Sequence, residues 1–231
     1  MTQIEAVRKE YRHAHTCIGY IADDFYQPIS NNESKDIKIL FESIECIDRH
    51  IDCLSDVSEI EELFQNIIGF LQNADEFEFH PELKTQLNKL KEMIDLSSRK
   101  EEFMKHVIKI KDVTSVLRVT KDINTYILKC LEEGEATADL TICVMDEERI
   151  DSKFEEFFIL AGATGNLLDT IFDANAGHAS GEMEIKPGFK FYSEEVFMAS
   201  SRLLKLFSMY PQKIRRLPLL TKFFRQFILR R

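Results

Sequence analysis

Residues 35–54 read KDIKILFESIECIDRHIDCL and contain neither glycine nor proline. Apolar side chains recur at every third or fourth position of this stretch, at Leu40, Ile44, Ile47, Ile51 and Leu54. This spacing places all five on one face of an α-helix. We therefore predict an amphipathic helix that buries this face against other helices.

The same helical period extends outward along nearly the whole chain. The predicted helices cover residues 2–25, 35–54, 58–73, the leucine-rich segment after His80-Pro81, 98–131, 137–145, 152–175, 193–209 and 213–229. Capping boxes are expected at Ser58–Glu61 and Ser98–Glu101, and a break or kink at Gly134. The chain has only 8 glycines and 5 prolines in 231 residues, too few for the turns of a β-sandwich or barrel. The sequence predicts an all-α fold, an antiparallel bundle of eight or more helices in one domain spanning residues 1–231.

Composition indicates the cellular compartment of the protein and excludes one class of partner. The five cysteines form no CxxC motif, which favours reduced thiols and a cytoplasmic protein. No secretory signal and no apolar run long enough to span a bilayer is visible. The formal net charge of −10 argues against nucleic acid as a partner.

The charge is unevenly distributed. Residues 196–231 contain nine basic side chains and no acidic one, so the rest of the chain carries −19. Within this stretch, residues 213–231 are predicted to form a basic helix with an apolar face. Two roles are open for this helix: peripheral contact with a membrane, or packing of its apolar face on the acidic body.

Two predicted helices each carry a pair of aspartates spaced four residues apart. Asp48 and Asp52 lie in IECIDRHIDCLSD, and Asp169 and Asp173 lie in GNLLDTIFDAN. Side chains at this spacing project from the same helix face one turn apart, where like charges repel. The second pair shares its face with small residues that leave room beside the backbone, Gly162, Gly165 and Asn166. If the two pairs face each other, they suit Mg²⁺, which prefers carboxylate and phosphate oxygens. Two solvated helix faces are the alternative.

These motifs resemble those of the squalene and phytoene synthases. The segment IDRHIDCLSD is similar to their first aspartate-rich motif, and GNLLDTIFDANAG to their second Asp-x-x-x-Asp motif. The stretch from Tyr126 to Gly134 lies between them where these enzymes have a tyrosine followed by a helix kink. The resemblance covers residues 41–177 and implies the isoprenoid-synthase helical fold.

The sequence departs from that family at several positions of the motifs. Glu45 stands where the family has arginine, Arg49 where it has the second aspartate, and Gly165 where it has asparagine. The resemblance therefore implies a divergent class I terpenoid enzyme, either a prenyl transferase or a terpene synthase (a lyase), more than head-to-head condensation. A head-to-tail prenyl elongating enzyme is the runner-up in this class, although its DDxxD motif is absent.

The resemblance implies that the enzyme ionises an allylic prenyl diphosphate with Mg²⁺ as cofactor. The aspartates that hold the ions would be Asp48, Asp52, Asp169 and Asp173. Arg49, Arg118, Lys121 and Asn166 are the expected diphosphate-binding residues. The alternative is a catalytically inactive all-α protein that binds prenyl lipids or another protein.

Overall fold

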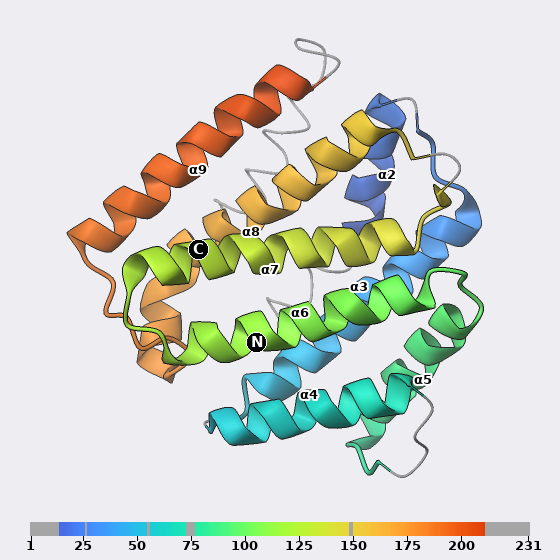
Figure 1. The fold of residues 1–231 in the computed structure, drawn as a ribbon, viewed down its shortest axis with the longest axis horizontal. Helices are drawn as coiled ribbons and strands as arrows, with labels where there is room; N and C mark the ends of the chain where they lie inside the picture. Colours follow the sequence, from blue (N-terminus) through green and yellow to red (C-terminus); the bar gives the residue numbers. More distant parts are fainter. Residues whose placement is uncertain (1–13, 26, 55, 73–76, 148–149, 211–231) are drawn as a thin grey trace, which may run out of the picture.

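The computed structural model describes residues 14–25, 27–54, 56–72, 77–147 and 150–210. Along these residues the chain forms eight helices and no strand, which confirms the all-α prediction. With the labels of Figure 1, they are α2 (Ala14–Asp24), α3 (Asn31–Ile51), α4 (Val57–Leu71), α5 (Pro81–Asp95), α6 (Lys100–Val119), α7 (Ile123–Cys143), α8 (Ser152–Ser180) and α9 (Phe189–Met209).

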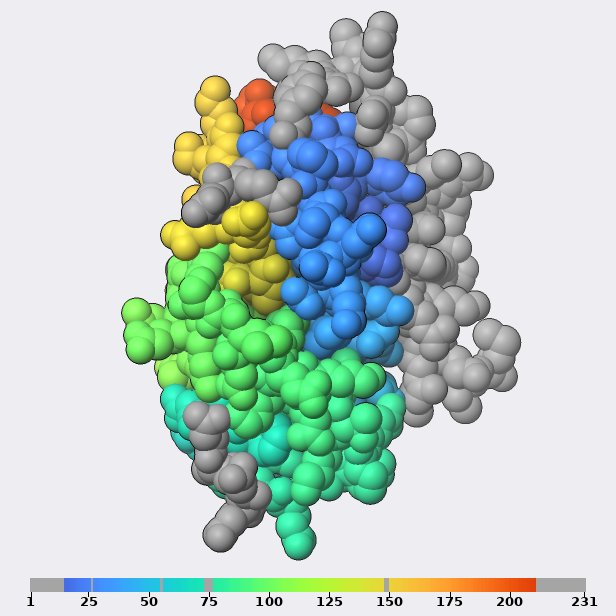
Figure 2. Space-filling view, turned by 90° about the vertical axis from the view of Figure 1, so that its right-hand side faces the viewer, coloured from blue at the N-terminus to red at the C-terminus, as the bar shows by residue number. Residues whose placement is uncertain are grey.

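The helices form two layers. In Figure 1, α9, α8, α7, α6 and α4 lie side by side in a front row, in which α6, α7 and α8 run antiparallel to their neighbours. Helices α2, α3 and α5 lie behind this row. Figure 2 shows the right-hand end of the molecule, where α2 and α3 lie beside the α7–α8 connection and the α5–α6 region.

The core includes Leu40 and Ile51 of the apolar face that is predicted for residues 35–54. Leu40 of α3, Leu71 of α4, Leu87 of α5 and Phe103 of α6 are all at most 2% exposed and belong to one cluster. A second cluster lies between α6, α7, α8 and α9 and includes Leu167. Burial of these side chains provides the main driving force for assembling the two layers.

The prediction of one long helix over residues 98–131 is wrong, because two helices cover this stretch. Helix α6 ends at Val119 and α7 begins at Ile123, because the Asp122 side chain accepts a hydrogen bond from the Thr125 N–H at 2.8 Å and caps a new helix. The predicted helix over 137–145 is the second half of α7. The connection contains neither glycine nor proline, so the apolar period gives no sign of the break.

Helix ends differ from the expected ones elsewhere too. The capping box is formed by Ser30 and Glu33 at the start of α3, while α4 is capped by Asp56 and the N-terminus of α6 has no side-chain cap. Helix α8 continues to Ser180 instead of ending near residue 175. Gly181 then ends it in the left-handed conformation (φ 84°), which glycine adopts without steric cost.

Gly134 lies inside α7 and serves close packing. A Cβ at Gly134 would come within 2.5 Å of the Gly162 carbonyl oxygen on α8, and a Cβ at Gly162 within 2.6 Å of the Gly134 oxygen. The two backbones therefore meet where both residues lack a side chain. This contact brings the aspartate-bearing helix α8 against α7.

No helix in the described ranges is both long enough and apolar enough to cross a bilayer. The basic helix expected over residues 213–231, and most of the first half of the helix expected over 2–25, lie outside the described residues.

Candidate functional site

A cavity of about 670 Å³ lies between the two layers and is lined mainly by α3, α6, α7 and α8. All four aspartates singled out in the sequence line it, Asp48 and Asp52 from the α3 side and Asp169 and Asp173 from α8. The four-residue spacing was enough to predict that each aspartate pair lies on one face of its helix. The fold brings the two faces to the same cavity.

Asp48 and Asp52 lie at the C-terminal end of α3, and Asp169 and Asp173 lie in the second half of α8. Both helices run toward the left of Figure 1, so we assign the four aspartates to the same end of the cavity. Asp48 lies in the last turn of α3, and Asp52 is its C-cap residue. A helix C-terminus carries partial negative charge, which repels a carboxylate. The two carboxylates also repel each other, so a cation between them is stabilising. Among the described residues, seven carboxyl groups and two guanidinium groups line the cavity. Its polar end therefore favours cations.

Arg118, in the last turn of α6, supplies one positive charge at this end. Its Nη2 lies 3.3 Å from Oδ1 of Asp52, and its side chain is 12% exposed whereas that of Asp52 is 53% exposed. Burial raises the pKa of Asp52, the carboxylate of Glu182 raises it further, and Arg118 acts in the opposite direction. Glu182, just beyond α8, is thus a further acidic residue of this end of the cavity.

Glu133 of α7 forms the centre of a hydrogen-bonded group in the cavity wall. The Thr114 hydroxyl donates to its Oε1 at 3.0 Å, and the Asn166 amide donates to its Oε2 at 3.1 Å. The same amide donates to the Cys130 carbonyl oxygen at 2.7 Å. Burial raises the pKa of Glu133, and these hydrogen bonds and Arg118 oppose the rise. Asn166 therefore holds α8 to α7 and fixes Glu133.

The rest of the cavity is largely apolar. Toward the opposite ends of the same helices it is lined by Leu40, Phe41, Phe103, Leu140 and Phe158. Four phenylalanines and one tyrosine contribute to the lining among the described residues. The small-residue face of α8 has two uses here: Gly162 makes room for α7, whereas Gly165 lines the cavity with no other atom within 4 Å of where its Cβ would be.

The remaining predicted cations are less well placed. Arg49 lines the cavity, but its Nη2 lies 2.8 Å from Oε1 of Glu82 on α5. Lys121 is not part of the lining. It lies in the α6–α7 connection, is 81% exposed, and its Nζ lies 3.8 Å from Oε2 of Glu184. Because α6 ends before Lys121, the helix face that would have carried it into the site does not exist.

Three residues of the site were not predicted from the sequence: Glu133, Glu182 and Thr114. Tyr126, Cys130, Glu133 and Thr137 recur at three- and four-residue spacing along α7, so a carboxylate on an otherwise apolar and small face was the available signal for Glu133. No comparable pattern marks Glu182, whose position depends on where α8 ends.

The donor chemistry of the polar end fits Mg²⁺. Carboxylate oxygens are its usual protein ligands, and phosphate oxygens commonly complete its coordination. Within the described residues, the four aspartates form no group of three ligand atoms within 4.8 Å of one another. The four aspartates are therefore not arranged to enclose a single ion. Each pair could hold an ion whose remaining coordination positions are filled by phosphate oxygens.

Comparisons of the chain with protein-family models, with curated proteins and with solved structures find no match.

Proposed function

We propose that this protein is a Mg²⁺-dependent class I isoprenoid synthase-like enzyme that ionises an allylic prenyl diphosphate. The observation that supports it most is that two Asp-x-x-x-Asp pairs from different helices line one end of a cavity whose remainder is largely apolar. A prenyl diphosphate has the same division, a strongly anionic head and a hydrocarbon tail.

The diphosphate would bind at the polar end. Asp48 and Asp52 on one side, and Asp169 and Asp173 on the other, would hold Mg²⁺, which when bound neutralises the charge of the leaving diphosphate. Arg118 lies beside Asp52 and can donate charge-assisted hydrogen bonds to diphosphate oxygens. Arg118 interacts electrostatically with Asp52 and with Glu133, both of which line the same cavity.

The hydrocarbon tail would extend into the apolar part. Burying it there removes apolar surface from water and excludes water from the carbocation left after ionisation. The ring faces of Phe41, Phe103 and Phe158 can stabilise that cation through their quadrupoles.

A second candidate is a non-catalytic protein that binds prenyl lipids or another protein. Arg49 favours it, because this residue stands where the resembling family has an aspartate and its guanidinium is bound to Glu82. The protein would then bind the hydrocarbon chain of a prenyl lipid in the cavity without catalysing diphosphate release.

Diphosphate release from allylic prenyl diphosphates of increasing chain length, with and without Mg²⁺, tests the proposal. Turnover is expected only with Mg²⁺, and Asp48→Asn or Asp169→Asn should abolish it while the variants stay folded. Asp112→Asn is the matched control, because Asp112 on α6 is 64% exposed and outside the cavity lining. Turnover in the Asp169→Asn variant equal to that of the wild type contradicts the proposed site. Tight binding of prenyl diphosphates without any release favours the second candidate.

A further inference from the structure

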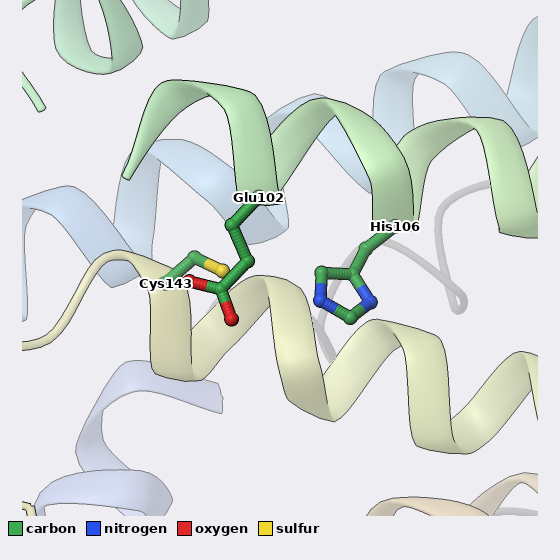
Figure 3. Close-up of side chains that lie close together, drawn as sticks. All are labelled: Glu102, His106 and Cys143. Carbon is green, nitrogen blue, oxygen red and sulfur yellow. The ribbon is translucent and has the colours of Figure 1, made fainter. Parts of the chain in front are cut away.

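A second group of metal-ligating side chains lies away from the cavity, between α6 and α7. Glu102 and His106 are four residues apart on α6, and Asp139 and Cys143 are four residues apart on α7. Because α6 and α7 are antiparallel neighbours, the start of α6 faces the end of α7. Figure 3 shows Glu102 and His106 projecting from α6 toward Cys143. None of these four residues lines the cavity.

The ligand atoms of Glu102, His106 and Cys143 all lie within 4.8 Å of one another. Ligand atoms of a tetrahedral zinc site are about 3.3–3.8 Å apart, given metal–ligand bonds of about 2.0–2.3 Å. The three atoms therefore need to close by at most about 1–1.5 Å to bind an ion. The Glu102 side chain is 47% exposed, which leaves room for that movement.

Asp139 orients the imidazole. Its Oδ2 lies 3.3 Å from Nδ1 of His106, so the carboxylate favours the tautomer that carries its proton on Nδ1 and leaves the lone pair of Nε2 available. In Figure 3, one ring nitrogen of His106 faces Glu102 and Cys143 and the other is turned away. A carboxylate on the second nitrogen is the usual support of a metal-bound histidine.

Arg99 supports the other oxygen donor. Its Nε donates to Oε2 of Glu102 at 2.7 Å, and its Nη1 donates to the Ile142 carbonyl oxygen at 3.0 Å. Arg99 lowers the pKa of the Glu102 carboxyl and so keeps it ionised. One carboxylate oxygen, Oε1, remains for an ion. The positive charge of Arg99 weakens cation binding, and the carboxylates of Glu102 and Asp139 together outweigh it.

We propose that Glu102, His106 and Cys143 form a binding site for a borderline transition-metal ion such as Zn²⁺, with Asp139 as the positioning residue for His106. A thiolate, an imidazole and a carboxylate together match zinc and not Mg²⁺ or Ca²⁺, which take oxygen ligands. Three protein ligands leave a fourth position for water. Burial raises the pKa of the Cys143 thiol to about 12, so the ion displaces one proton from sulfur as the metal–sulfur bond forms.

Titration of the metal-stripped, reduced full-length protein with Co²⁺ tests this site. We expect one ion per chain, with the intense visible absorption of tetrahedral cobalt and a near-ultraviolet thiolate-to-cobalt band that added Zn²⁺ removes. Cys143→Ser should abolish the thiolate band, and His106→Gln and Glu102→Gln should each weaken binding at least about tenfold. Asp139→Asn should weaken binding about 10- to 100-fold without removing the thiolate band.

Two controls come from the same chain. Cys53→Ser removes an exposed thiol, and His80→Gln removes one ring of the His50–His80 pair, whose centroids lie 5.5 Å apart. Both should keep the spectrum and the affinity. Asp169→Asn should also keep them, so this site can hold even if the proposed diphosphate chemistry fails.

Some outcomes would overturn the site. Absence of a thiolate band in the wild type would do so, as would loss of the band in Cys53→Ser instead of Cys143→Ser. Because Cys143 is buried, that variant must be shown to unfold cooperatively. Glu102→Gln alters a largely exposed side chain, so unchanged Co²⁺ affinity in this variant and in His106→Gln would also exclude the site.

Discussion

The guanidinium of Arg118 lies 3.3 Å from the carboxylate of Asp52 and joins the C-terminal end of α6 to that of α3. Both residues line the cavity, and Arg118 also opposes the rise that burial causes in the pKa of Glu133 on α7. One cation thus faces carboxylates from two other helices. Arg118 is therefore placed both to hold the polar end of the cavity together and to contact an anion bound there.

Replacing Arg118 with methionine should affect both ligand binding and stability. Loss of its charge-assisted hydrogen bonds should weaken binding of a prenyl diphosphate about 10- to 100-fold, equivalent to about 1.5–3 kcal/mol. The free energy of unfolding should fall by about 1–3 kcal/mol, because Glu133 loses its nearby positive charge. Calorimetric binding and urea unfolding measure the two effects.

Lys121→Met is the matched control for Arg118→Met. Lys121 is a cation near the same end of α6, but it is 81% exposed and outside the cavity lining. Surface ion pairs of this kind contribute little to stability. If Lys121→Met weakens diphosphate binding as much as Arg118→Met, Arg118 has no special role at the cavity.

Two glycines on α8 should respond in opposite ways to substitution by alanine. Gly165→Ala should increase the free energy of unfolding by about 0.5–1 kcal/mol, because alanine is the better helix former and its Cβ meets no atom within 4 Å. Gly162→Ala should destabilise by about 1–3 kcal/mol, because its Cβ would lie 2.6 Å from the Gly134 oxygen. Urea unfolding of both variants distinguishes the two roles.

Gly165 also tests the use of the cavity. The side chain of Gly165→Leu would project into the space beside Asp169, so it should reduce prenyl diphosphate binding without lowering stability as Gly162→Ala does. Undiminished binding in Gly165→Leu would mean that no ligand occupies this part of the cavity.

The helices and the aspartate pairs were predictable because they depend on local spacing. Apolar residues such as Leu40 and Ile51 at three- and four-residue intervals require one buried helix face, and Asp48 and Asp52 follow the same period. That this pair meets Asp169 and Asp173 across a cavity depends on tertiary contacts such as Gly134 against Gly162. A single sequence does not specify which helices pair.

The charged residues of the interior were not predicted, because their burial also depends on tertiary packing. Glu133 lies in the cavity wall and Glu195 of α9 is completely buried, whereas charged side chains in a helical pattern are expected to face solvent. The break between α6 and α7 escaped because it depends on one side-chain cap, Asp122 to Thr125, within an unbroken apolar period.

Glu195 should make the stability of the protein depend on pH. Its side chain is 0% exposed, and neither carboxylate oxygen has a hydrogen-bond partner in the described part of the chain. Burial raises its pKa to about 8, whereas an unfolded glutamate has a pKa of about 4.3. Between these values the folded state holds a proton that the unfolded state has lost. The contribution of Glu195 to the free energy of unfolding is therefore most favourable below about pH 4.3 and is lost progressively as pH rises toward 8.

Glu195→Gln should remove this part of the pH dependence, because glutamine has nearly the same shape and no titratable proton. The free energies of unfolding of wild type and variant should be similar near pH 4 and diverge as pH rises. The wild type should lose up to about 1.4 kcal/mol per pH unit relative to the variant until the divergence levels off near pH 8. Glu156→Gln is the control, since Glu156 is 61% exposed and pairs with Lys205 at 3.1 Å, and its curve should follow that of the wild type. Parallel curves for the wild type and Glu195→Gln from pH 5 to 8 would show that the carboxyl of Glu195 titrates alike in the folded and unfolded chains, which a fully buried and unpartnered carboxyl should not do.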